Sequence, residues 1–371
     1  MIKPMPKTPL YQSMNLLSCL LLTPQDDGQS SSSKMAKLRS DVRNISRSEF
    51  DDLLRLASSN HVVVRGMEVF LAIMHGEKDD TRAAWAQLAL ASERARVTNV
   101  LTCLEAICSA LEDEMHDVMV IKSLDHWPDL GSDLDLYTNA NAEVISKFMV
   151  RRFNAHIGSR SWGDRLAGKW SFLMPGLSEA VEIHIGRLGQ TGEQVAIASQ
   201  LVKRSRRIMI GDRAFRVPSV PDRVIISTLQ RMYRHFYFRL CDIVDSAALV
   251  EMGGIDFLDL RASAKKAGIW EGVATYLVIV SDYVSKYRGL GLDLPLFVHA
   301  AAHFGGDEVY YSREFLRVPI MPQSVGLYGK QLACVLQKLE LKNGARLSLL
   351  PCLATAALVG QRITGSDKGI W

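Results

Sequence analysis

The sequence predicts an α+β protein, in which a small mixed β-sheet lies between a helical N-terminal section and a larger helical C-terminal domain. Two observations predict this fold class. Stretches with strand character are confined to the middle of the chain, at 118–138, 170–185 and 207–218. Before and after them, apolar residues recur at helical spacing. With 371 residues, 48% of them hydrophobic, the chain can hold several domains and a sizeable core.

We expect four regions along the chain. They are an N-terminal helix with a mobile linker, a helical section, the sheet region and a helical C-terminal domain, at 1–33, 34–116, 117–218 and 219–371. The linker is expected at Gln25–Ser33, which is polar and rich in Gly and Ser. Ser46 and Glu49 have the spacing of a capping box, so a helix of the second region should begin there.

Composition argues against a secreted or membrane-bound protein. The six cysteines show no CxxC spacing, which indicates free thiols in a reducing compartment, and we expect a cytoplasmic protein. The apolar stretch Met14–Leu22 has no evident cleavage site, which favours an amphipathic first helix over a signal peptide. The apolar stretch Ala345–Gly360 falls short of the ~20 residues that span a bilayer, and no membrane partner is expected. A net charge of +4 is mild, and it leaves nucleic-acid binding open without indicating it.

Candidate metal ligands lie in the stretch Val118–Thr138. An apolar strand at Val118–Ile121 is followed by a turn-rich segment and then by the short strand Asp133–Tyr137. Successive strand side chains point to opposite faces, so Asp133 and Asp135 share one face. Two such carboxylates repel each other unless a cation lies between them, and a hard divalent cation with oxygen ligands meets that need. The alternative is a solvated edge strand whose two acids bind nothing.

A third acid lies farther along the chain. The segment Trp170–Ile185 is expected to form a hairpin with its turn at Pro175-Gly176. In its second strand, Glu182 and His184 alternate with apolar residues and therefore share a polar face. If this strand pairs with Asp133–Tyr137, Glu182 completes a cluster of three carboxylates.

These elements together resemble the nucleotidyltransferase superfamily, whose polymerase-β-like palm has a strand, a small turn, an Asp-x-Asp strand and a later strand with a third acid. The closer likeness is to an uncharacterised bacterial nucleotidyltransferase family with a Lys-Gly turn and an acid-x-His strand. Here the matching elements are Lys122-Ser123, Asp133-Leu134-Asp135 and Glu182-Ile183-His184, and the likeness runs from about Glu49 to about Pro295. Ser123 departs from the family's Gly, and a positive φ there would strain it.

The resemblance implies that 117–218 is the palm of a metal-dependent enzyme. It would move a nucleoside monophosphate from an NTP, with ATP favoured, to an acceptor hydroxyl and release pyrophosphate. Two Mg²⁺ ions, or Mn²⁺ in their place, would be held ~3.5–4 Å apart by Asp133, Asp135 and Glu182. Because like charges repel, removal of Asp133 or Asp135 should preserve or raise the stability of the metal-free protein. The sequence does not identify the acceptor, which is a small molecule, a peptide or protein, or an RNA end.

Nucleotide contacts are expected from the turn and from a later helix. The helix Ser227–Val244 carries the family's His and its Arg-x-x-Asp set, matched by His235 and Arg239–Asp242. An ion pair between Arg239 and Asp242 that only fixes helix packing is the alternative. The expected nucleotide-binding residues are Lys122, Ser123, His184, Arg231, Arg234, His235 and Arg239.

Two rival functions remain at this point. One is a non-catalytic binding or scaffold protein that keeps the palm fold, which the departure at Ser123 favours. The other is a kinase-like transfer of a terminal phosphoryl group from the same site. The mass of the product on a trapped acceptor separates the three functions.

Overall fold

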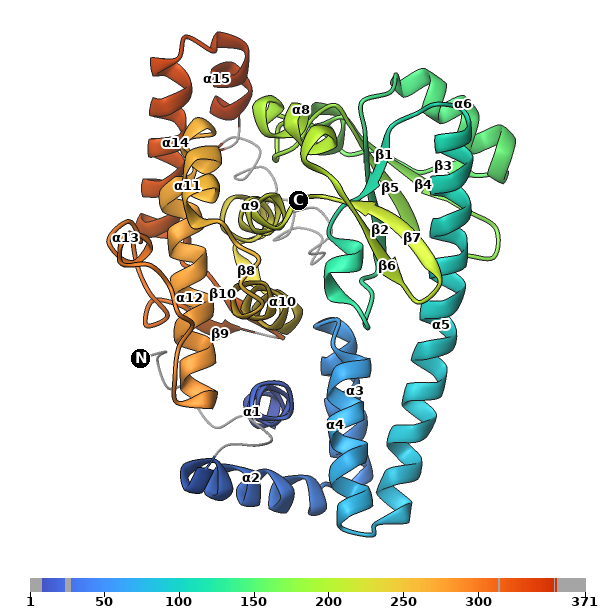
Figure 1. The fold of residues 1–371 in the computed structure, drawn as a ribbon, viewed down its shortest axis with the longest axis vertical. Helices are drawn as coiled ribbons and strands as arrows, with labels where there is room; N and C mark the ends of the chain where they lie inside the picture. Colours follow the sequence, from blue (N-terminus) through green and yellow to red (C-terminus); the bar gives the residue numbers. More distant parts are fainter. Residues whose placement is uncertain (1–8, 24–27, 313, 350, 352–371) are drawn as a thin grey trace, which may run out of the picture.

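The computed structural model of the chain describes residues 9–23, 28–312, 314–349 and 351. It is an α+β protein, in which a mixed five-stranded sheet is flanked by helices from both ends of the chain (Figure 1). The predicted fold class is therefore confirmed. Among the residues described, no helix combines the length and the apolar character that a membrane crossing needs.

The N-terminal part of the chain is helical as far as residue 113. The helices are α1 (Pro9–Leu22), α2 (Gly28–Arg43), α3 (Arg47–Ser59), α4 (Val63–Gly76) and α5 (Asp80–Asp113). As predicted, α3 begins at a capping box, in which Ser46 Oγ accepts from the N–H of Glu49 and the Glu49 carboxylate accepts from the N–H of Ser46. Residues 28–33, expected in the linker, belong to α2, because Leu38 and Val42 farther along this helix are buried in the core and hold it in place. Residues 24–27 lie outside the described part.

The five strands of the main sheet are β1 (Val118–Val120), β2 (Asp133–Thr138), β3 (His156–Ile157), β4 (Lys169–Leu173) and β5 (Ala180–Ile185). Their order is β1-β2-β5-β4-β3, and only β2 and β5 run parallel to each other. The expected hairpin of β4 and β5 is confirmed, and so is the pairing of the Asp133 strand with the Glu182 strand. In this register Asp135 lies directly opposite Glu182.

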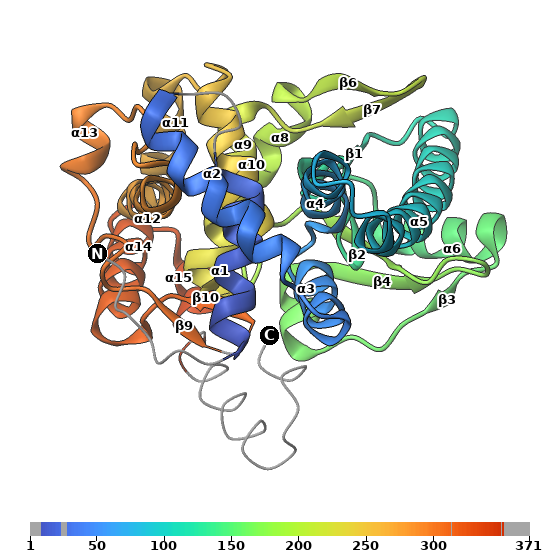
Figure 2. The same cartoon turned by 90° about the horizontal axis from the view of Figure 1, so that it is seen from below.

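The two faces of the sheet have different surroundings. Leu134, Leu136, Val181 and Ile183 point to one face, where they share a core with α5 and α6 (Ala142–Phe153) (Figure 2). The opposite face carries Asp135, Glu182 and His184. The alternation of polar and apolar residues in β2 and β5 thus separates the core from the candidate site.

Shorter elements surround the sheet. These are η1 (Ser123–His126), α7 (Trp162–Ala167), α8 (Val195–Arg204), β6 (Arg206–Ile210) and β7 (Arg213–Val217). The strands β6 and β7 form a hairpin in the region of strand character at 207–218, as a separate two-stranded sheet that packs against α5 and β1. The helix α8 ends at Arg204, and Arg206 and Arg207 already belong to β6.

The C-terminal part begins at α9 (Val220–Gln230). It continues with η2 (Arg231–His235), β8 (Tyr237–Phe238), α10 (Leu240–Glu251), α11 (Phe257–Lys266), α12 (Trp270–Arg288), α13 (Leu296–His299), β9 (Tyr310–Ser312), β10 (Phe315–Arg317), η3 (Ile320–Ser324), α14 (Val325–Gln337) and α15 (Leu341–Ser348). The helix α1 is far in sequence from α10 and α12 but packs against both, so the helices of both chain ends share one hydrophobic core.

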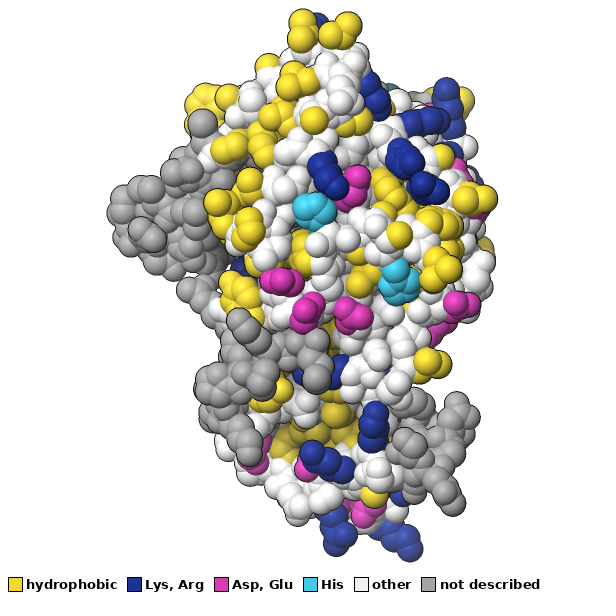
Figure 3. Space-filling view, turned by 90° about the vertical axis from the view of Figure 1, so that its left-hand side faces the viewer, with side chains coloured by type: hydrophobic (Ala, Val, Ile, Leu, Met, Phe, Trp, Pro, Cys, Tyr) yellow, Lys and Arg dark blue, Asp and Glu magenta, His cyan; other side chains and the backbone are white. Residues whose placement is uncertain are grey.

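On the face that α13 and α14 occupy, charged side chains of both signs and hydrophobic side chains are interspersed (Figure 3).

One prediction for this part is wrong. The single helix expected at Ser227–Val244 is broken, because Phe236 has a left-handed backbone (φ 54°) between η2 and β8. The helical C-terminal part also contains the three-stranded sheet β8-β10-β9. Phe238 is buried opposite Leu316 in this sheet, and Tyr237 stacks on Phe315, so aromatic packing outweighs the helical spacing of the sequence.

Candidate functional site

The site lies where β2 and β5 present acidic side chains side by side. Ligand atoms of Asp135, Glu182 and His184 lie within 4.8 Å of one another. Asp133 belongs to the same face of β2 and is exposed at its beginning. Its charge also reaches the cluster, because it contributes to the raised pKa of Glu182. The parallel pairing of β2 with β5 thus gathers the three acids on one face of the sheet.

Two buried lysines contact these acids. Lys122 Nζ lies 2.7 Å from Asp135 Oδ1, and Lys169 Nζ pairs with Glu182 Oε2. Lys169 Nζ also lies 3.9 Å from Asp164 Oδ1, in the first turn of α7. Sequence reasoning missed Lys169, although its register opposite His184 places both on one face. That register was the only available signal, and it required knowing how β4 and β5 pair.

The carboxyl groups differ in acidity. Burial alone would raise the pKa of Asp135, but the Lys122 ammonium and the bond from His184 outweigh it and hold that pKa well below its usual range. Burial and the neighbouring Asp135 charge raise the pKa of Glu182. Partial loss of water and the same Asp135 charge raise the pKa of Asp133. Asp135 is therefore the firmly ionised member, and Glu182 is the better proton acceptor.

His184 is a buried, neutral side chain. Its Nε2 lies 3.1 Å from Asp135 Oδ1, and because a carboxylate only accepts, Nε2 carries the proton. Burial lowers the pKa of His184 to about 4. Its Nδ1 is buried and has no hydrogen-bond partner in the described part of the chain. This nitrogen is therefore an acceptor open to a ligand.

The turn after β1 holds an unusual backbone conformation. Lys122 has φ 63° and ψ −53°, and the N–H of Ser123 donates to the carbonyl of Ile121 at 2.7 Å, which defines a γ-turn with positive φ. The strain that was expected at Ser123 therefore falls on Lys122 instead. The Ser123 hydroxyl donates to Asp133 O and accepts from the N–H of Asp135. Ser123 thus fixes the turn to the acidic strand.

A pocket adjoins the lysine and histidine of the site. It contains about 400 Å³ of empty space, part of it open to solvent, and Lys122, His184 and Arg234 provide its cationic and imidazole groups. Arg234 Nε is buried and lacks a hydrogen-bond partner within the described residues. Gln190, from the loop after β5, lines the same pocket, and its Oε1 is also buried without a partner there. The pocket therefore offers unpaired polar groups next to the acids.

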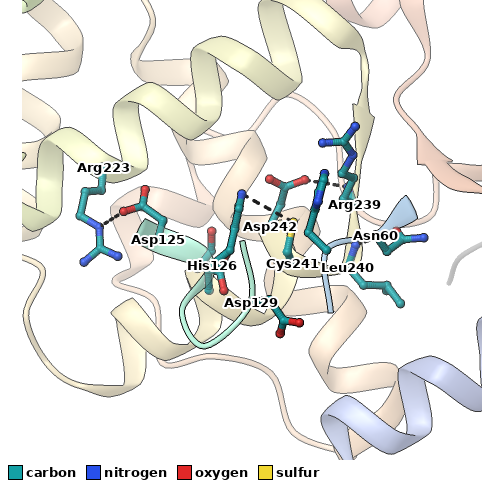
Figure 4. A network of polar contacts seen from close by, with 12 residues as sticks. Asn60, Asp125, His126, Asp129, Arg223, Arg239, Leu240, Cys241 and Asp242 are labelled. Carbon is teal, nitrogen blue, oxygen red and sulfur yellow. Dashed lines mark hydrogen bonds and ion pairs between the residues drawn. The ribbon is translucent and has the colours of Figure 1, made fainter. Parts of the chain in front are cut away.

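The other cations expected at the nucleotide lie in different surroundings. Arg231 is fully buried, and its Nε lies 2.8 Å from Asp242 Oδ2. The Asp242 carboxylate accepts from the backbone N–H of Arg239 (Figure 4). The Arg239 guanidinium lies over the rings of Tyr237 and Phe315. The ion pair of Asp242 is thus made with Arg231 rather than with the Arg239 side chain.

Arg239 nevertheless acts on the site electrostatically, whereas His235 carries no charge. The Arg239 charge counters the rise in the pKa of Asp133. Burial, and then the charge of Arg234, place the pKa of His235 well below its usual range, so His235 is neutral. Of the expected nucleotide-binding residues, the pocket brings together Lys122, His184 and Arg234.

Comparisons with known proteins give a distant likeness among solved structures. No protein-family profile matches the chain, and no curated protein matches it. Among solved structures, the chain is similar to an antigenic nucleotidyltransferase-like protein from Paracoccidioides brasiliensis, with 12% sequence identity and a TM-score of 0.33. The match covers 53% of this chain and 95% of that chain. At so low a TM-score, the likeness supports no statement about the activity of this chain.

Proposed function

We propose that the protein is a metal-dependent nucleotidyltransferase, which transfers a nucleoside monophosphate from an NTP to an acceptor hydroxyl and releases pyrophosphate. The observation that carries this proposal is the pairing of Asp135 with Glu182 across parallel strands, with Asp133 at the rim of the same face. Lys122 and Arg234 beside these acids supply positive charge in a pocket. Acids for metal ions next to cations for phosphates are the arrangement that nucleotidyl transfer needs.

The donor set fits magnesium. Asp133, Asp135 and Glu182 offer hard carboxylate oxygens, which Mg²⁺ prefers, and Mn²⁺ accepts the same set. When bound, two such ions would lower the pKa of the acceptor hydroxyl and neutralise charge on the triphosphate. The ammonium groups of Lys122 and Lys169, which contact the same carboxylates, would then be free to contact phosphate oxygens.

The residues of the chain take distinct roles in this proposal. Glu182, whose pKa is raised by burial and by Asp135, lies nearest the acceptor hydroxyl and takes part in its deprotonation. Lys122 and Arg234 hold the triphosphate, and the open Nδ1 of His184 accepts a hydrogen bond from the nucleotide or the acceptor. The positive charge of Arg239 favours the ionised form of Asp133 by lowering its pKa. ATP is the favoured donor.

A second candidate function is a non-catalytic scaffold with the same fold. The specific observation in its favour is that Lys122 and Lys169 already neutralise Asp135 and Glu182 without any metal ion. A protein that had lost its metals would keep such pairs. The retention of all three acids on one face favours the enzyme.

The test is incubation of the purified protein with each NTP, Mg²⁺ and cell extract, followed by pyrophosphate detection and mass analysis of trapped products. We expect pyrophosphate and a nucleotidyl adduct, both lost in Asp135→Asn and Glu182→Gln. Asp212→Asn, which changes a carboxylate that is 98% exposed, is the matched control. A phosphoryl adduct would assign kinase-like chemistry, and no adduct with any NTP would favour the scaffold.

A further inference from the structure

A second cluster of metal-ligand residue types lies at the junction of three parts of the chain. It comprises His126 at the end of η1 together with Cys241 and Asp245 from α10. Ligand atoms of these three residues lie within 4.8 Å of one another. Cys241 and Asp245 are four residues apart on one helix and so share a face. The cluster uses none of the residues assigned to the nucleotide site.

The three side chains already contact one another. His126 Nδ1 lies 2.5 Å from Asp245 Oδ2. The other ring nitrogen, Nε2, lies 3.9 Å from Cys241 Sγ (Figure 4), and one ion takes only one of these two nitrogens. The other carboxylate oxygen of Asp245 accepts from Arg65 at 2.6 Å, and Arg65 also binds Asp129. A hydrogen-bonded carboxylate and an oriented imidazole are typical of the surroundings of protein metal sites.

The thiol of Cys241 and a neighbouring histidine have few close polar partners. Cys241 is fully buried, and 3.9 Å is long for a hydrogen bond from sulfur. Two donors of one tetrahedral zinc ion are about 3.5 Å apart, given zinc bond lengths of ~2.0–2.3 Å. The ring of His61 lies parallel to that of His126, with centroids 5.8 Å apart, and its Nε2 is buried without a hydrogen-bond partner among the described residues. An unpaired polar atom thus lies beside the cluster.

We propose that Cys241, His126 and Asp245 bind one zinc-type divalent cation. Sulfur, imidazole nitrogen and carboxylate oxygen form a borderline donor set, which suits zinc far better than magnesium. The remaining coordination position is available to water or to a shifted His61 ring. Binding releases two protons to solvent, the thiol proton of Cys241 and the proton on the His126 nitrogen that takes the ion.

Such an ion would connect the segment that follows Lys122 to the helical C-terminal part. η1 begins directly after Lys122, and α10 begins where Asn60 accepts from the N–H of Leu240. The ion would therefore fix the turn of the nucleotide site relative to α10, without itself taking part in the transfer. The inference does not depend on the proposed nucleotidyl transfer.

The test adds Co²⁺, as a spectroscopic substitute for zinc, to the purified full-length chain. Thiolate bound to Co²⁺ gives a charge-transfer absorption in the near ultraviolet, which oxygen ligands do not give. We expect this band to saturate at one ion per chain and to disappear when Zn²⁺ displaces the cobalt. Cobalt at Asp135 and Glu182 gives no such band, so failure here is distinguishable from failure of the proposed function.

Three variants complete the experiment. Cys241→Ala should lose the band, whereas Cys108→Ala, which removes a thiol from α5, should keep it. Asp245→Asn retains the thiol and should weaken cobalt binding by at least about 10-fold, since losing a ligand costs no less than losing a residue that orients one, so this variant serves if Cys241→Ala does not fold. Absence of the band in the folded wild-type chain overturns the proposal. An unchanged band in Cys241→Ala, or unchanged affinity in Asp245→Asn, does so too.

Discussion

The Lys122 ammonium lies 2.7 Å from Asp135 Oδ1, and the backbone of Lys122 has a φ of 63°. The strained turn and the acidic strand are therefore one unit, since the Ser123 hydroxyl also bonds the backbone on both sides of Leu134. Strain of this kind costs about 1–3 kcal/mol and persists only where the surroundings enforce it. The chain thus fixes a cation next to a carboxylate at the expense of local backbone stability.

The first prediction separates the backbone of Lys122 from its charge. Lys122→Gly and Lys122→Ala both remove the ammonium, but Gly tolerates positive φ. We expect Lys122→Gly to be the more stable of the two by about 1 kcal/mol, because relief of ~1–3 kcal/mol of strain exceeds the ~0.5–1 kcal/mol entropic cost of Gly. Urea unfolding of both variants measures this difference.

The same pair of variants tests the role of the Lys122 charge. Nucleotide affinity should fall alike in both, since a ground-state phosphate contact acts mainly on binding. Lys78, which is exposed and has φ 55°, provides a matched control: Lys78→Gly should again exceed Lys78→Ala in stability, while nucleotide affinity stays unchanged. Retained affinity in Lys122→Ala would remove this residue from the nucleotide site.

The second prediction concerns the acids, and the structure reverses one expectation. Removal of Asp133 should raise the stability of the metal-free chain, because the fold raises the pKa of Asp133 and so disfavours its charge. Asp135→Asn should instead lower stability by about 3–5 kcal/mol, because it leaves the buried Lys122 ammonium unpaired.

Both substitutions should still reduce pyrophosphate release, by at least about 100-fold. Thermal unfolding without metal and turnover with Mg²⁺ measure the two effects separately. Opposite changes in stability with a common loss of turnover are the expected pattern. Equal stability of the two variants would contradict the assigned charge states.

The third prediction distinguishes two arginines of η2. Arg231 is fully buried with Asp242, so Arg231→Ala should cost about 3–5 kcal/mol of stability, the penalty for an unpaired buried charge. Arg234 lines the pocket with an unpartnered Nε, so Arg234→Ala should leave the melting temperature nearly unchanged and weaken NTP binding. A loss of stability in Arg234→Ala equal to that in Arg231→Ala would make Arg234 a structural residue.

Local pattern was sufficient to predict the acidic strands. The alternation in Asp133–Tyr137 and in the Glu182 strand predicts one polar face, and the pairing of β2 with β5 confirms that the two strands are adjacent. Lys169 was not predictable, because its place opposite His184 depends on the register between two strands. The break at Phe236 was missed for a similar reason. Tyr237 and Phe238 fit a helical pattern locally, and only their partners Phe315 and Leu316, far along the chain, turn them into a strand.

The fourth prediction concerns magnesium and Lys169. The Lys169 ammonium pairs with Glu182, so it competes with a cation for that carboxylate. Lys169→Met should therefore be destabilised without metal and stabilised by Mg²⁺ more than the wild type, because ligand binding to the folded state adds to its stability. The measurement is the melting temperature across a Mg²⁺ titration, with Lys147→Met on α6 as a surface control. An equal Mg²⁺ effect in Lys169→Met and wild type would argue against metal binding at Glu182.

The last prediction follows from the neutral His184. In the unfolded chain its pKa is the ordinary ~6.5, and in the folded chain burial lowers it to about 4. Between these values the unfolded state binds more protons, so His184 stabilises the fold above pH ~6.5 and this contribution is lost as the pH falls toward 4.

The variant His184→Gln keeps a donor toward Asp135 but does not titrate. Between pH 7 and pH 5, we expect the wild type to lose about 2 kcal/mol more stability than this variant. Urea unfolding at both values measures the loss, and His75→Gln, at an exposed position of α4, should behave as wild type. His61, His126 and His235 titrate in both proteins, so their contributions cancel in the comparison. Parallel loss of stability in wild type and His184→Gln would mean that the His184 ring is charged in the fold, and its Nδ1 could then not accept a hydrogen bond from a ligand.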